Sequence, residues 1–129
     1  MQKLTHEQLQ KNIPDLMNMQ ENHYLYHNGY VYFSCVKPGA RDATGWLSGG
    51  EVFKRVKDDG SKVTVFDETH NQSVTTASSS HTYSYEVPKI ADDYVILTIW
   101  YSRSNDWEDD SQTLYTYRVK ADGASGLER

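Results

Sequence analysis

YLYHNGYVYFSC, the stretch from Tyr24 to Cys35, decides the fold of this chain. Two runs of aromatic and β-branched residues flank Asn28-Gly29, and Asn-Gly between such runs is the strongest short-range signal for a β-hairpin. The pattern returns in residues 51–57 and 62–66, which surround the turn sequence DDGS at residues 58–61. The sequence therefore predicts two consecutive hairpins, which supply four antiparallel strands between residues 23 and 66.

A second copy of this pattern is predicted in the last third of the chain. RVKDDG, from Arg55 to Gly60, recurs 63 positions later as RVKADG, from Arg118 to Gly123. Tyr30-Val31 recurs 64 positions later as Tyr94-Val95. Two anchors with nearly the same offset indicate a repeated unit, and chance agreement between short strands with similar turns is the alternative.

The alternation of side chains also matches between the two copies. Val31, Phe33 and Cys35 share one face of a strand, because successive side chains of a strand point to opposite faces. Their counterparts in the second copy are Val95, Leu97 and Ile99, and Val52 and Val56 correspond to Tyr115 and Val119. We therefore expect the same face to be buried in both copies.

The N-terminus and the connection between the copies have a different character. Thr5 and Gln8 form a capping-box pattern, which predicts a short helix that Pro14 interrupts. Residues 67–80 are polar, rich in Ser and Thr, and predict a surface linker. The expected organisation is one domain with a helical cap (1–20), a first β repeat (23–66), the linker (67–80) and a second β repeat (82–129).

The expected fold class is mainly β, with two antiparallel four-stranded repeat units and a short N-terminal helix. Each unit resembles a blade of bacterial β-propellers of the YWTD-like and TolB-like kinds, and residues 52–61 and 114–126 carry the resemblance. The repeat exceeds the roughly 40 to 50 residues of a blade, and insertions at 37–50 and 102–112 would account for the excess. Two blades cannot close a ring of about four to eight, so the resemblance implies either assembly from several chains or a fragment. Two sheets packed as a sandwich are the alternative.

Composition narrows the classes of partner. The formal net charge is -5 and no cluster of Lys and Arg occurs, which argues against a nucleic-acid partner. Signal-peptide and membrane-spanning runs of apolar residues are absent from the sequence, so no membrane partner is expected. Hydrophobic residues make up only 37% of the chain, which favours a homo-oligomer in which a partner completes the core.

Large aromatic residues are the best candidates for ligand binding. Trp46 lies in the glycine-rich stretch GWLSGG, and Trp100, Tyr101 and Trp107 lie at or inside the matching insertion of the second copy. Aromatics on loops at a sheet edge stack on sugars or anchor a protein partner. In the alternative interpretation, Trp46 and Trp100 fill the base of their own sheets.

Arg55 and Arg118 occupy equivalent positions in the two copies. Each alternates with an inward-facing valine, so we expect both arginines to point outward as solvated strand residues. In a ring they would form a charged stripe able to receive an anionic ligand.

Catalytic and metal-binding patterns are missing from the sequence. His23 and His27, four apart on a strand, would lie about 13 Å apart and cannot share an ion. The acidic residues around Trp107 lack the spacing of a calcium loop and predict a solvated insertion, and the lone Cys35 is expected in the core. We expect no cofactor and no metal.

The preferred hypothesis is a non-enzymatic binding or scaffolding module that recognises a protein or a carbohydrate. The alternative is a small enzyme or nucleotide-binding protein whose site forms between subunits from Arg and Tyr side chains.

Overall fold

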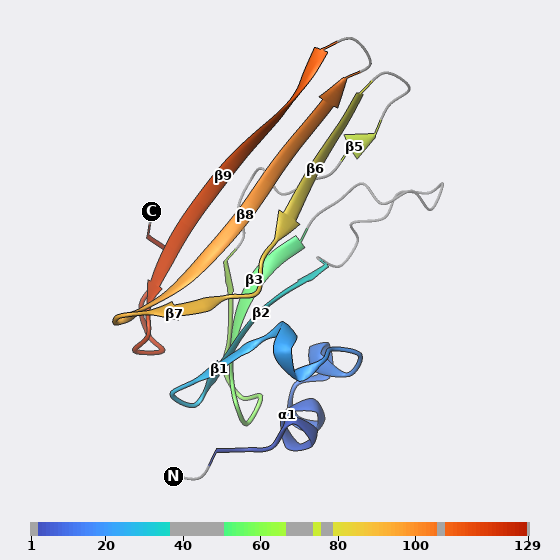
Figure 1. Cartoon of the computed structure of the whole chain (residues 1–129). Helices are drawn as coiled ribbons and strands as arrows, with labels where there is room; N and C mark the ends of the chain where they lie inside the picture. Colours follow the sequence, from blue (N-terminus) through green and yellow to red (C-terminus); the bar gives the residue numbers. More distant parts are fainter. Residues whose placement is uncertain (1–2, 37–50, 67–73, 76–78, 106–107, 129) are drawn as a thin grey trace.

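The computed structural model describes residues 3–36, 51–66, 74–75, 79–105 and 108–128. They form a mainly β structure with two antiparallel sheets and one short α-helix (Figure 1). None of the described helices is long and apolar enough to cross a membrane. The elements are α1 (His6–Asn12), the 3-10 helices η1 (Pro14–Leu16) and η2 (Glu21–His23), and the strands β1 (Leu25–His27), β2 (Tyr30–Val36), β3 (Glu51–Lys57), β4 (Val63–Phe66), β5 (Val74–Thr75), β6 (Ser79–Tyr85), β7 (Lys89–Ala91), β8 (Tyr94–Asn105) and β9 (Glu108–Lys120).

The N-terminal helix is the predicted cap. The Gln8 backbone N–H donates to Thr5 Oγ1 at 3.2 Å, and the Thr5 N–H donates to Gln8 Oε1 at 2.8 Å, which completes the capping box. Pro14 starts η1 because its fixed φ and missing N–H suit the first turn of a new helix rather than the continuation of α1. The helical segment therefore forms where the sequence predicts it.

The first sheet has the strand order β1-β2-β3-β4, as the two predicted hairpins require. Asn28 and Gly29 adopt φ angles of 52° and 82°, the left-handed conformation that a two-residue hairpin turn needs. Gly60 has a φ of 79° in the turn between β3 and β4. Local turn chemistry thus sets the register of the β1–β2 and β3–β4 hairpins.

The second sheet is built around β8, which pairs with β6, β7 and β9. Two stretches contain more strand than the sequence indicated. The stretch 67–80 is not a linker throughout, because β5 and the start of β6 lie within it. The predicted insertion at 102–112 is largely strand, because β8 runs to Asn105 and β9 resumes at Glu108. Hydrogen bonds between these long strands pair their backbone N–H and C=O groups. The strands therefore form although their side chains are polar and show no apolar periodicity.

Strand pairing in β7, β8 and β9 follows the pairing in β1, β2 and β3. Val31 lies opposite Val56 in the first sheet, and Val95 lies opposite Val119 in the second. Leu25 opposite Tyr32 is matched in the same way by Lys89 opposite Ile96. Beyond this shared part the sheets differ, because a single bridge between Arg118 and Glu128 stands where the first sheet has β4.

The two matching faces do not pack against each other. On the first sheet this face meets the helical segment, and on the second sheet it meets the opposite face of the first sheet. The helix-side cluster contains Leu9, Ile13, Leu16, Tyr24, Val31, Phe33 and Val56, with Cys35 partly buried against it. The inter-sheet cluster contains Tyr32, Phe53, Phe66, Val95, Leu97, Ile99, Tyr117 and Val119.

The molecule therefore has three layers, namely the helical segment, the first sheet (β1–β4) and the second sheet (β5–β9) (Figure 1). At β2 and β3 the first sheet is buried on both faces, which explains why β2 carries apolar or aromatic residues at consecutive positions. The second sheet is buried on one face only. In the described residues the sheets do not close into a ring or a barrel.

Candidate binding surface

Arg55 is enclosed rather than solvated, which corrects the expectation from the sequence. It is 4% exposed, and its Nη1 donates to the Ser125 carbonyl at 2.9 Å. Its guanidinium lies 5.9 Å from the ring centroid of Tyr30 and 5.4 Å from that of Phe66. The expectation was wrong because alternation leaves a solvent face only in a sheet that is covered on one side, and the second sheet covers this face.

The turn that encloses Arg55 comprises residues 121–125, which we call the second Asp-Gly turn. The Asp122 carboxylate accepts hydrogen bonds from the Ala124 N–H at 2.8 Å, the Ser125 N–H at 2.9 Å and the Ser125 hydroxyl at 2.8 Å. These bonds, aided by the nearby Arg55 charge, lower the pKa of Asp122 to about 2. The Asp122 carboxylate therefore stabilises the turn that contains it.

Gly123 brings this turn against the first sheet. Its φ is 77°, and a Cβ atom at this position would lie 2.2 Å from Cε2 of Tyr30. Only glycine combines this backbone conformation with such a close approach. The second Asp-Gly turn therefore fits tightly over the Tyr30 ring and the Arg55 guanidinium.

Arg118 repeats the geometry of Arg55 without the cover. Its guanidinium lies 4.6 Å from the ring centroid of Tyr94, and its side chain is 48% exposed. Glu128 lies beside it, with 3.9 Å between the charged groups, and their backbones form two hydrogen bonds of 2.7 Å. Arg118 thus points outward, as predicted.

Trp100 and Tyr101 lie within β8 and not on a loop. Trp100 pairs with Leu114 and Tyr101 pairs with Thr113. Successive side chains of a strand point to opposite faces, so the two aromatics cannot contribute to one surface. Trp100 is 39% exposed and does not fill the base of its sheet. Trp46 and Trp107 lie outside the described residues.

The second sheet has one open face, which we call the outer face. Leu114 is 49% exposed there beside Trp100, and these two residues form an apolar pair near the middle of the β8–β9 hairpin. Toward the turn between β7 and β8 the face carries Arg118 and Lys120 on β9 with Lys89 on β7, and the carboxylates of Glu128, Asp92 and Asp93 lie beside these cations. Strand alternation places on this face Tyr94, Ile96, Thr98 and Trp100 of β8, Leu114, Thr116, Arg118 and Lys120 of β9, and Lys89 and Ala91 of β7.

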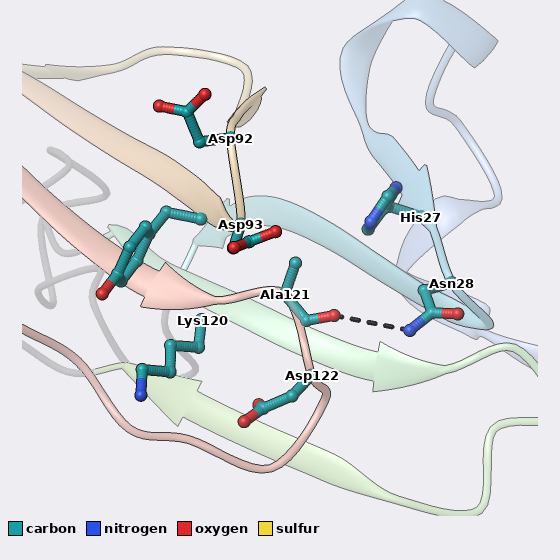
Figure 2. A pocket seen from close by; sticks show the side chains of 8 residues that line it. His27, Asn28, Asp92, Asp93, Lys120, Ala121 and Asp122 are labelled. Atoms are coloured by element: carbon teal, nitrogen blue, oxygen red, sulfur yellow. Dashed lines mark hydrogen bonds between the residues drawn. The ribbon is translucent and has the colours of Figure 1, made fainter.

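A groove lies where the turns of the two sheets meet (Figure 2). His27 and Asn28 line it from the first sheet, and Asp92 and Asp93 line it from the second. Asn28 Nδ2 donates to the Ala121 carbonyl at 3.4 Å across the seam. Among the described residues, no group of three or more His, Cys, Asp or Glu side chains is placed to hold a metal ion. Residues of both sheets thus line the groove. These lining residues do not include a nucleophile paired with a base.

Neither a family model, nor a curated protein, nor a solved structure matches this chain. Function is therefore inferred from the geometry of this chain alone.

The sequence analysis missed the partners of the two arginines. Tyr30 recurs as Tyr94 in the second copy, and Arg55 recurs as Arg118. Hairpin register places Arg55 opposite Tyr32, one same-face position from Tyr30, which is within reach of a long side chain. Pairing the predicted strands in register would have found both cation–π contacts.

Proposed function

We propose that this chain is a non-enzymatic binding module that recognises a protein through the outer face of its second sheet. The observation that carries the proposal is the pairing of Trp100 with Leu114, which leaves two large apolar side chains 39% and 49% exposed on a face that no described element covers. Exposed apolar residues that are contiguous rather than scattered mark interaction sites.

A protein fits this face better than a carbohydrate does. The aliphatic side chains of Ile96 and Leu114 accompany Trp100 on a flat strand surface, and such residues pack well against another apolar surface. Sugar recognition needs acid or amide groups that fix several hydroxyls around a stacked ring, whereas the other positions directly beside Trp100 on this face, Ser84, Thr98 and Ser102, carry only short hydroxyl side chains. Aromatic and arginine side chains are also enriched among the residues that dominate protein interfaces.

The partner surface should be apolar opposite Trp100 and should carry charged groups of both signs near the turn between β7 and β8. Arg118, Lys120 and Lys89 share this end of the outer face. Opposite charges steer encounter and fix the orientation of a complex. The enclosure of Arg55 weighs against a nucleotide site built from both arginines. The proposed activity is therefore recognition without catalysis.

Site-specific photo-crosslinking tests this proposal. A benzophenone amino acid is placed at Leu114 and, as the matched control, at Val65, which is 50% exposed on the first sheet. The proposal expects a defined protein adduct from extract of the source organism at position 114 only, and loss of that adduct when Trp100→Ala is added. Equal adducts at both positions would refute it, and Trp100-dependent binding on a glycan array would assign the face to carbohydrate instead.

A further inference from the structure

The contact between the two sheets repeats a contact that the first sheet makes with the helical segment. The turn after β3, residues 58–61, packs against α1. A Cβ atom on Gly60 would lie 2.3 Å from the Asn12 carbonyl oxygen, and Asn12 Nδ2 donates to the Asp58 carbonyl at 3.0 Å. The first sheet thus contacts the helical segment through the glycine turn that follows its third strand.

The second Asp-Gly turn does the same one layer further on. Gly123 approaches Tyr30 of the first sheet, and Asn28 Nδ2 donates to the Ala121 carbonyl at 3.4 Å. Ala121 holds the position after its third strand that Asp58 holds in the first sheet. Two successive layers therefore use an asparagine amide, a backbone carbonyl and a glycine in corresponding places.

The outer face carries the receiving half of this contact once more. Tyr94 and Arg118 stand in the register of Tyr30 and Arg55, and their cation–π contact is already formed at 4.6 Å. On the first sheet the equivalent pair is covered by the second Asp-Gly turn, whose Ser125 carbonyl accepts from the arginine. On the second sheet the Arg118 side chain is 48% exposed, with Glu128 beside it, and Tyr94 borders the groove that Asp92 and Asp93 line.

We infer that the outer face receives a further antiparallel sheet unit from a partner chain, with a glycine turn packed on Tyr94 and a turn carbonyl accepting from Arg118. The inference rests on the proposed function for the choice of face and adds the kind of partner. The partner unit would cover Trp100 and Leu114 with an apolar strand face, as Val95 and Leu97 of the second sheet cover the first.

One departure from the pattern specifies the partner further. Asp92, with a φ of 54°, occupies the turn position of Asn28, whose φ is 52°. Asp92 accepts hydrogen bonds and cannot donate to a turn carbonyl as Asn28 does. The partner turn should therefore present a donor, such as a lysine, an asparagine or a free backbone N–H, to Asp92.

A second intact copy of this chain fits the outer face poorly. The strand face that would have to dock, with Val31, Phe33 and Val56, is covered by the helical segment in the same chain. Two outer faces packed with their strands pointing the same way would place the cations Arg118 and Lys120 of one copy near those of the other. A sheet unit with a free apolar face avoids both obstacles.

A tandem protein tests the inference with the chain's own unit as the probe. Residues 67–129 are appended after Arg129 of the full chain, so that the added unit has no preceding layer of its own. Trp100→Phe in the added unit leaves Trp100 of the parent unit as the reporter. Because the added turn offers a carbonyl rather than a donor to Asp92, the tandem protein also carries Asp92→Asn in the parent unit. In this protein docking predicts a several-fold slower hydroxyl-radical labelling of the parent Trp100 than in the unextended chain, and a single cooperative unfolding transition.

Matched substitutions separate docking from general stabilisation. Gly123→Val in the added unit should restore labelling of the parent Trp100, whereas Gly126→Ala, where an added Cβ meets nothing within 4 Å, should not. Asp92→Asn in the parent unit restores the missing donor and should increase the docked population about fivefold. An unchanged Trp100 labelling rate in the Asp92→Asn tandem protein would overturn the inference.

The outcome is separable from that of the proposed function. If the tandem unit does not dock but the crosslinked partner still depends on Trp100, the face binds a protein of another kind. If the unextended chain self-associates at micromolar concentration and Trp100→Ala abolishes this, the face belongs to a second copy, and the inference fails.

Discussion

Replacing Gly123 by alanine should destabilise the fold by an amount that can be worked out from the contact with Tyr30. An added Cβ would lie 2.2, 2.7 and 2.9 Å from three atoms of the Tyr30 ring. Forcing a group into a packed site costs about 1–3 kcal/mol, and a residue with a Cβ at positive φ costs about 1–2 kcal/mol more. We expect Gly123→Ala to lower the free energy of unfolding by about 2–5 kcal/mol.

Two other glycines separate the steric contribution from the backbone contribution. Gly29 has a φ of 82°, but an added Cβ there meets nothing within 4 Å, so Gly29→Ala should cost only the backbone strain of about 1–2 kcal/mol. Gly126 has neither constraint, and Gly126→Ala should be close to neutral. The difference between Gly123→Ala and Gly29→Ala measures the contact between the turn and the first sheet.

Urea denaturation followed by far-ultraviolet circular dichroism gives these free energies, since the slope shows whether the two-state description holds for each variant. The expected order of destabilisation is Gly123→Ala first, Gly29→Ala second and Gly126→Ala last. A Gly123→Ala protein no less stable than the Gly29→Ala protein would refute the close packing of the second Asp-Gly turn on Tyr30, and with it the template for the partner contact.

The remaining predictions concern charge, pH and capping. Arg55→Met should cost about 1–3 kcal/mol, because it leaves a carbonyl acceptor in the enclosed site without its donor, whereas Arg118→Met should cost less than about 1 kcal/mol; thermal unfolding of the pair measures both. The pKa of Asp122 is about 2 in the folded protein against an ordinary value of 3.8, so its contribution to stability is present above pH 4 and lost as the pH falls through 2; Asp122→Asn should flatten stability between these pH values. Burial raises the pKa of Tyr32 above 10.0, so its contribution is complete below pH 10 and is lost as the pH rises beyond it; Tyr32→Phe should reduce this alkaline loss. Thr5→Ala should destabilise α1 by about 1 kcal/mol, which urea denaturation would detect.

The first sheet could be predicted from the sequence because its signals are local. Asn28-Gly29 fixes one turn, the Asp-Gly turn at residues 58–61 fixes the other, and the strands between them alternate clearly. The capping box at Thr5 is equally local. Elements that depend on neighbours within a few residues are therefore visible in the sequence.

The long hairpin and the extra strands of the second sheet could not be predicted. Residues 79–82, SSHT, at the start of β6 carry polar side chains without apolar alternation, and backbone pairing with β8 holds them in a strand. Pairing with β9 likewise keeps residues 102–105 of β8 in a strand, where an insertion was expected. Long-range backbone pairing leaves little trace in composition when the side chains are polar.

The order of the three layers could not be predicted from the sequence either. Val31 and Tyr32 are adjacent and both are fully buried, one against the helical segment and the other against the second sheet. The pattern of β2 indicates burial on both faces but does not say what covers each face. Arg55 was misread for this reason, because its face was assumed to meet solvent.

Hydroxyl-radical footprinting of the unmodified chain, read residue by residue by mass spectrometry, tests the central claim most directly. Trp100 and Leu114 should be labelled rapidly, whereas Tyr32 and Phe53, which are 1% and 2% exposed, should be protected in the native state and react only on unfolding. Protection of Trp100 together with rapid labelling of Tyr32 would contradict the three-layer arrangement and its open outer face.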